Sequence, residues 1–183
     1  MNKRIAILRG INVGGNRKIV MVDLKKLFND LGHENVQTYI QSGNVIFEPK
    51  STGSDSEIAA QIERSVTEQY GFNVPVIVLK ADQLRDAISF NPFYKKDISD
   101  VDRLHITFLK ELPEKDSITE IKNYNLHPDN YHIEKRNVFV YCSGKYSDSK
   151  LTNKFFENKL KVTATTRNWK TVLKLSELSD YNK

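Results

Sequence analysis

Residues 40–46 read IQSGNVI, and residues 133–139 read IEKRNVF. In each stretch a short polar link joins two runs of β-forming residues, which is the pattern of a β-hairpin. The first link is Ser42-Gly43, whose glycine suits a tight turn between strands at 36–41 and 44–48. The two stretches correspond strand for strand and turn for turn, which predicts two related halves.

Each hairpin is embedded in the same order of elements. Residues 4–8 are apolar on both faces, as in a central strand that is covered on both sides. Leucine and phenylalanine recur with helical spacing over residues 24–31, and Gly32 provides a helix stop. Pro75 lacks a donor for the sheet, so its strand at 74–79 belongs at an edge. The order βαββαβ predicts a four-stranded antiparallel, ferredoxin-like sheet with helices on one face.

The rest of the chain repeats this order with weaker periodicity. We expect further helices at 58–70, 81–90, 118–121, 151–160 and 169–178, further strands at 104–108, 131–134 and 137–141, and a short extended piece at Val162. The predicted fold is α+β, with two tandem ferredoxin-like βαββα(β) units, antiparallel sheets and a C-terminal helix. The first unit covers 1–80, a helix and connector cover 81–102, and the second unit covers 103–183.

Composition and charge limit the classes of protein to which the chain can belong. Among 183 residues, 28 Lys and Arg exceed 23 Asp and Glu by five (28 − 23), which favours anionic partners without specifying one. The lone Cys142 forms no internal disulfide and fits a reducing compartment. The apolar run from Ile5 stops at Arg9, too early for a signal peptide, and no apolar stretch approaches the ~20 residues that span a bilayer. We therefore expect a soluble cytoplasmic protein with no membrane contact.

A glycine-rich stretch at 9–18, RGINVGGNRK, lies between the first strand and the first helix. Glycines allow several backbone N–H groups to converge, the following helix adds a positive dipole end, and the basic side chains add charge. The stretch matches neither the Walker A loop nor GxGxxG. Two interpretations stay open, an anion-binding loop and a tight connection with solvated basic side chains.

A second stretch, ATTRNWKT at 164–171, precedes the last helix. Thr166 or Asn168 is suited to cap that helix. Arg167 and Lys170 place cations near its N-terminus, where the dipole disfavours them by about 0.3–1 kcal/mol. A bound anion or a surface carboxylate would remove that cost.

Strand alternation predicts a polar and aromatic face on the second sheet, opposite Leu104 and Val138. This face comprises His105, Thr107, His132, Glu134, Asn137, Phe139 and Tyr141. Base stacking, as in RNA-recognition motifs, is one interpretation, but the glycine pattern of that motif is missing, which favours packing between the halves. No histidines or carboxylates have metal-site spacing, and Cys142 has no recognisable catalytic partner, so we assign no metal, cofactor or catalytic residue.

Three segments together resemble a known family: LRGINVGGN at 8–16, TYIQSGNV at 38–45 and ATTRNWKT at 164–171, with SKLT at 149–152 as a weaker fourth. They are similar to the bacterial family called domain of unknown function 1697. The resemblance implies a cytosolic bacterial protein with ferredoxin-like halves, and it implies no activity.

These segments are loops and helix starts, where ligands are commonly bound. We hypothesise that they converge on a cleft between the halves and bind an anionic ligand, either a phosphate-bearing small molecule or single-stranded nucleic acid. The candidate residues are Arg9, Gly10, Asn12, Gly14, Gly15, Asn16, Gln41, Ser42, Gly43, Asn44, Lys150, Arg167, Asn168 and Lys170. One alternative is an enzyme for a phosphorylated or carboxylated metabolite, with Arg9 and Arg167 as charge clamps. Another is a protein–protein interaction scaffold that uses the aromatic side chains of the second sheet.

Overall fold

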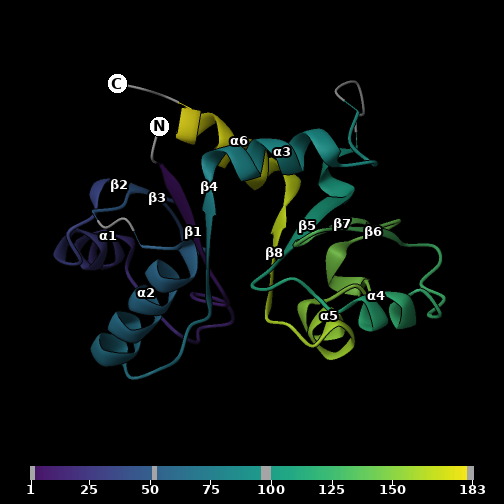
Figure 1. The fold of residues 1–183 in the computed structure, drawn as a ribbon, viewed down its shortest axis with the longest axis horizontal. Coiled ribbons are helices and arrows are strands. Elements are labelled where there is room, and N and C mark those ends of the chain that lie inside the picture. The colour runs from purple at the N-terminus through teal and green to yellow at the C-terminus, as the bar shows by residue number, and fades with distance from the viewer. Residues whose placement is uncertain (1–2, 51–52, 96–99, 181–183) are drawn as a thin grey trace. The chain divides into compact units, whose positions relative to one another are not determined.

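The computed structural model describes residues 3–50, 53–95 and 100–180. Its internal contacts divide into two compact units. The first unit holds the described residues up to Arg85 together with those from Leu175 onward, and the second unit runs from Asp86 to Lys174. Each unit contains a four-stranded sheet with helices between its strands, so the α+β, ferredoxin-like fold predicted from the sequence is confirmed (Figure 1).

The first unit has the order of elements that the sequence predicts. Its elements are β1 (Arg4–Leu8), α1 (Met21–Asp30), β2 (Glu34–Tyr39), β3 (Asn44–Glu48), α2 (Asp55–Tyr70) and β4 (Val76–Lys80). The strand order is β2-β3-β1-β4 with antiparallel pairing, so β4 lies at an edge, as Pro75 indicates. Central strand β1 has buried side chains at every position from Ile5 to Leu8.

Alternation along the strands directs one face of this sheet toward α1 and α2. Ala6 pairs with Val45 on one side and with Val78 on the other, and all three belong to the core beneath the helices. α2 begins with a capping box, in which the Ser54 side chain accepts from the Glu57 N–H and the Glu57 carboxylate accepts from the Ser54 N–H. Such caps satisfy backbone donors that have no partner within the helix.

The second unit has the same strand arrangement. Its elements are β5 (Leu104–Leu109), α4 (Lys115–Ile121), β6 (Asn130–Glu134), β7 (Asn137–Tyr141), α5 (Asn153–Leu160) and β8 (Ala164–Asn168). The strand order is β6-β7-β5-β8, again antiparallel throughout. Val138, Val140 and Cys142 belong to the core that includes Phe156 and Leu160 of α5.

The unit boundaries fall within two helices, α3 (Ala81–Phe90) and α6 (Trp169–Asp180). From the sequence, residues 103–183 are predicted to form the second unit, whereas the contacts of residues 175–180 group them with the first. An ion pair of 2.5 Å between Arg85 of α3 and Asp180 of α6 is one of the interactions on the first unit's side. The partners are far apart in sequence, so local patterns carry no sign of this pairing.

Two local interpretations of the sequence are corrected. Residues 164–168 form strand β8, which pairs with β5, whereas the sequence places an extended piece at Val162 and reads 164–171 as the approach to a helix. β8 is an edge strand whose polar residues hide the alternation that usually marks a strand. In the first hairpin Tyr39 pairs with Asn44, so the link comprises residues 40–43 rather than Ser42-Gly43 alone.

The predicted polar face of the second sheet is wrong for β5. Partners in adjacent strands point to the same face, and Thr107 pairs with Val138 while Ile106 pairs with Phe139. Thr107 and, by alternation, His105 therefore lie on the side of the helix-covered core, and Leu104 shares the face of Phe139. The error arose because all six positions of β5 are buried, so polarity does not mark the outer face.

Aromatic rings of the second unit cover the Phe139 face. Phe139 has 0% exposure, and its ring centroid lies 6.4 Å from that of Trp169. Tyr94 lies 5.3 Å from Trp169, and Phe93 lies 6.2 Å from Tyr141. A fully buried Phe139 offers no surface on which a base can stack.

His33 is a buried histidine in the core of the first unit. Its side chain is 4% exposed, and its ring centroid lies 5.8 Å from that of Phe28 and 4.6 Å from that of Phe47. Within the described part of the chain, neither ring nitrogen has a hydrogen-bond partner. Burial lowers the pKa of His33 below its ordinary value, because an apolar environment disfavours the imidazolium.

We expect the free energy of unfolding to decrease as the pH falls below about 6.5, the ordinary histidine pKa. Below that pH the unfolded chain binds a proton that folded His33 resists. The stability from neutral His33 is therefore complete above pH ~6.5 and is lost as the pH falls toward the lowered folded pKa, by at most about 1.4 kcal/mol per pH unit. Urea denaturation on both sides of this pH should show a shallower pH dependence of the unfolding free energy for His33→Phe than for the wild-type protein. Equal slopes in the two proteins would contradict this account.

Candidate functional site

The loop between β1 and α1 is a small, internally bonded hairpin. The Asn12 N–H donates to the Arg17 carbonyl at 3.2 Å, and the Asn16 N–H donates to the Val13 carbonyl at 3.1 Å. Gly14 and Gly15 occupy the two central positions with φ of 59° and 78°. Positive φ at both central residues is the requirement of a type I′ turn, which glycine meets at no steric cost.

Asn12 ties this loop to the hairpin turn between β2 and β3. Its Oδ1 accepts from the Ile19 N–H at 2.9 Å, and its Nδ2 donates to the carbonyls of Ile19 and Gln41, each at 2.9 Å. Asn12 has φ of 57°, a conformation that asparagine tolerates better than most residues. We call residues 9–19 and 40–44, which Asn12 connects, the paired loops.

Gly43 packs directly on the first loop. Its carbonyl accepts from the Leu8 N–H at 2.8 Å, and it has φ of 76°. A Cβ at this position would lie 2.7 Å from Ile11 Cδ1 and 2.9 Å from Leu8 Cβ. Asn44 is buried next to it and donates to the Tyr39 carbonyl at 3.2 Å and to Ser42 Oγ at 3.0 Å. The hairpin turn therefore has little freedom to move away from the loop.

Ile40 has strained backbone geometry at the tip of the hairpin. Its φ is 50°, which is unfavourable for a β-branched side chain and costs on the order of 1–3 kcal/mol. Its side chain is nevertheless 47% exposed. Backbone strain at an exposed residue is not offset by burial in the hydrophobic core. In many proteins such strain is concentrated at functional sites.

The paired loops carry positive charge. They contain Arg9, Arg17 and Lys18 and no acidic residue. Arg17 and Lys18 are exposed, and a terminal guanidinium nitrogen of Arg17 lies 3.6 Å from the place of a Cβ on Gly10. Val13 beside them is 63% exposed. The structure therefore brings together the candidate residues from Arg9 to Asn16 and from Gln41 to Asn44 on one surface of the first unit.

The four candidate residues of the second unit have separate local roles. Asn168 caps α6, since its Oδ1 accepts from the Thr171 N–H at 2.8 Å. Lys170 forms a 2.6 Å ion pair with Asp102, so a surface carboxylate offsets the cost of a cation near the helix N-terminus. Lys150 is exposed and lines a cavity of about 220 Å³.

Arg167 lies within β8, opposite Ile106 of β5. Its guanidinium donates to the Thr166 carbonyl at 2.9 Å. Burial lowers the pKa of Arg167 to about 10, so the side chain still carries its charge at neutral pH. Because Arg167 and the paired loops belong to different units, their convergence on one cleft stays a prediction.

Sequence reasoning missed a polar cluster around Asp129. One carboxylate oxygen accepts from the Ser143 N–H at 2.8 Å and the Ser143 hydroxyl at 3.0 Å, and the other accepts from the Ser149 hydroxyl at 2.6 Å. Partial burial raises the pKa of Asp129, but these hydrogen bonds outweigh burial and hold it below its ordinary value. The partners lie 14 and 20 residues from Asp129, so no spacing pattern reveals them.

Two kinds of feature are absent from the part of the chain that the structure describes. Within residues 3–50, 53–95 and 100–180, no group of three or more His, Cys, Asp or Glu side chains has an arrangement that could hold a metal ion. Within the same ranges, none of the helices combines the length and apolar character needed to cross a bilayer.

The close packing of Gly43 is testable against a matched glycine. Gly43→Ala adds a Cβ that collides with Ile11 and Leu8, in addition to the cost of positive φ, about 1–2 kcal/mol. Gly14→Ala has φ of 59° but no atom within 4 Å of its Cβ, so it measures the backbone cost alone. We expect Gly43→Ala to lose about 1–3 kcal/mol more than Gly14→Ala in urea denaturation. Equal losses would show that the turn does not pack on the loop as described.

Comparisons with known proteins give a family and a structural relative. The model of the family described as protein of unknown function (DUF1697) matches residues 1–139. Among solved structures, the conserved bacterial protein SP0830 from Streptococcus pneumoniae is 26% identical in sequence with a TM-score of 0.77, and the match covers 99% of each chain. The search of curated proteins gives no match. Because the family model matches residues 1–139, most of its length, the chain belongs to the DUF1697 family.

Proposed function

We propose that the paired loops bind a phosphate-bearing ligand, and that single-stranded nucleic acid is the form this surface suits best. The observation that carries the proposal is the position of Asn12, whose side chain is held by two hydrogen bonds with Ile19 in its own loop and donates a third to the Gln41 carbonyl, so that it joins the two segments. On the resulting surface Arg9, Arg17 and Lys18 are accompanied by no acidic residue from either segment. Such a surface attracts phosphate groups by charge alone.

The paired loops are ordered before any ligand arrives. The first loop is closed by its own backbone bonds, and Gly43 packs against Leu8 and Ile11. An ordered loop loses less conformational entropy on binding than a flexible one, so more of the contact energy appears as affinity. The strained Ile40 is consistent with a loop whose shape serves a purpose other than stability.

Because the side chains of the paired loops are exposed, they favour an extended ligand over one that is enclosed in a pocket. Arg17 and Lys18 are exposed on the loop, where they are accessible to backbone phosphates. Val13, at 63% exposure, and Ile40, at 47%, offer apolar contacts for unpaired bases nearby. Surfaces that bind single strands usually combine basic side chains with aromatic ones, and in the paired loops the exposed apolar side chains are aliphatic.

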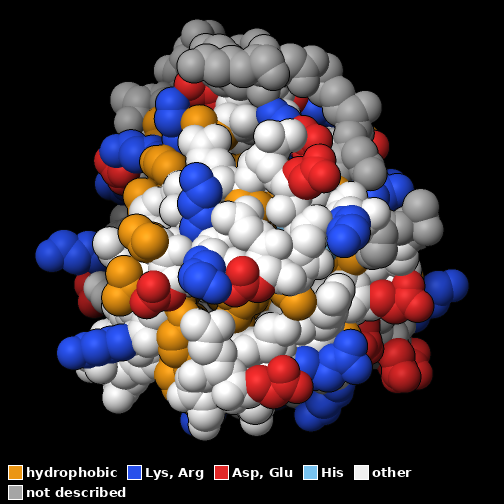
Figure 2. All heavy atoms as spheres, turned by 90° about the vertical axis from the view of Figure 1, so that its left-hand side faces the viewer, with side chains coloured by type: hydrophobic (Ala, Val, Ile, Leu, Met, Phe, Trp, Pro, Cys, Tyr) orange, Lys and Arg blue, Asp and Glu red, His pale blue; other side chains and the backbone are white. Residues whose placement is uncertain are grey.

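The distribution of charged side chains also favours a short region of contact between the protein and the nucleic acid. On the face that Figure 2 shows, Lys and Arg side chains are interspersed with Asp and Glu side chains, and no continuous basic patch covers it. On α1 of the same unit as the paired loops, Lys26 forms an ion pair of 2.6 Å with Asp30. We therefore expect few phosphates to be contacted and the contact to centre on the paired loops.

Binding of a fluorescent single-stranded DNA, measured by anisotropy at several salt concentrations, tests the proposal. For single strands the slope of log affinity against log salt is about −0.7 per neutralised phosphate. The double variant Arg17→Ala with Lys18→Ala should bind more weakly, with a slope shallower by about 1.4 if each side chain neutralises one phosphate. Lys25→Ala with Arg64→Ala removes the same charge from exposed positions of α1 and α2 and should keep the wild-type slope.

Two outcomes would contradict the nucleic-acid form of the proposal. The first is equal affinity and slope for the two double variants. The second is a thermal shift with one nucleotide or phosphorylated metabolite but no binding of DNA, since ligand binding raises the melting temperature of the folded state. The second outcome would move the ligand to the class of small molecules.

A further inference from the structure

The second unit contains a cavity of about 460 Å³ between α4 and β6. Its volume lies within the range of about 300–1,000 Å³ that is typical of small-molecule sites. The lining consists of one residue of α4, the segment that follows this helix, and edge strand β6: Ile118, Lys122, Tyr124, Asn125, Leu126, His127, Asp129, Asn130, Tyr131, His132 and Ile133. All of the lining belongs to the second unit, whereas the paired loops belong to the first.

The difference between the two units explains why the cavity is open. In the first unit α1 has 10 residues and packs against edge strand β2. In the second unit the corresponding helix α4 has 7 residues and ends at Ile121, without comparable packing against edge strand β6. The Tyr131 hydroxyl donates to the Ile121 carbonyl at 3.0 Å and so links strand to helix across the base of the opening. The shorter helix of the second unit therefore leaves room for a cavity beside β6.

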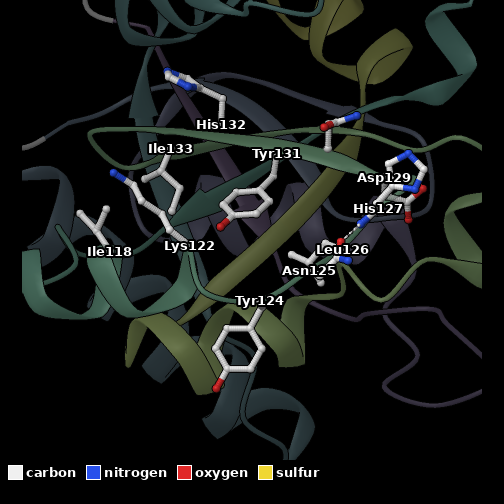
Figure 3. A pocket seen from close by; sticks show the side chains of 11 residues that line it. Ile118, Lys122, Tyr124, Asn125, Leu126, His127, Asp129, Tyr131, His132 and Ile133 are labelled. Atoms are coloured by element: carbon white, nitrogen blue, oxygen red, sulfur yellow. Dashed lines mark hydrogen bonds between the residues drawn. The ribbon is translucent and has the colours of Figure 1, made fainter.

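The two ends of the cavity differ in chemistry, as Figure 3 shows. Lys122 lies at one end with Ile118 and Ile133, His127 and Asp129 lie at the other, and the Tyr131 ring lies between them. Asp129 is the acidic residue of the lining, and both of its oxygens already accept hydrogen bonds from Ser143 and Ser149. Within the described part of the chain, Lys122 has no ion-pair partner.

We infer that this cavity is a second ligand site, which takes a small organic anion with a flat apolar body. The anionic group pairs with the Lys122 ammonium. The apolar body lies along the side chains of Ile118, Ile133 and Tyr131, which supply the hydrophobic wall. A few convergent polar groups in a mostly formed hollow are the general features of small-molecule sites.

Benzoate is a suitable probe, and its neutral amide benzamide has nearly the same size and shape. Titration of the full-length protein, followed by backbone amide NMR shifts, should give saturable shifts in Asn130–Glu134 with benzoate and weaker binding of benzamide. Lys122→Gln should weaken benzoate binding up to about fivefold, which corresponds to the upper end of a solvent-exposed ion pair. Lys115→Gln removes a charge from the same helix outside the cavity and should leave benzoate affinity unchanged.

Several results would overturn the inference. They are the absence of saturable shifts in β6, equal binding of benzoate and benzamide, and equal effects of Lys122→Gln and Lys115→Gln. The Arg17→Ala with Lys18→Ala variant provides an independent check, because its substitutions lie in the other unit. If that variant abolished the shifts in β6, benzoate would be binding at the paired loops, and the cavity would not be the site.

Discussion

Burial of the central strand of each sheet on both faces is the constraint from which the rest of the structure follows. β1 is buried from Ile5 to Leu8, and β5 is buried along its whole length. Backbone polar groups in such strands must be satisfied by neighbouring strands, which β3 and β4 do for β1, and β7 and β8 for β5. Polar side chains that are accessible to a ligand therefore lie at strand ends and sheet edges, and both proposed sites are at such places.

In the loops next to the end of β1, the backbone conformation determines where the polar side chains lie. Gly14, Gly15 and Gly43 adopt positive φ, and Asn12 adopts it while using its amide to join two segments. None of these residues adds to the hydrophobic core. Their combined effect is to hold Arg17 and Lys18 on an ordered surface, so that attraction to phosphate is not opposed by the entropy of an unstructured loop.

At the edge of the second sheet, the same topology leads to a different surface. A helix as short as α4 leaves part of β6 without the cover that α1 provides for β2. The resulting hollow contains few charges, and the Asp129 carboxylate is already occupied by serine donors. The two units share one strand order but differ in the surfaces that we propose bind ligands. The difference comes from helix length and loop composition and not from the architecture of the sheets.

The sequence by itself determined the order of elements in the first unit, the edge position of β4 and two candidate caps for α6, Thr166 and Asn168, since these depend on periodicity, on Pro75 and on side chains within a few residues of their partners. It also placed the glycine-rich loop directly after the central strand. Only the tertiary structure decided that residues 164–168 form β8, that Thr107 faces the helix side, that Asp102 pairs with Lys170, and that Ser143 and Ser149 surround Asp129. Each of these depends on strand register or on contacts between distant residues, and a local pattern carries no information about the partner that burial and hydrogen bonding finally select.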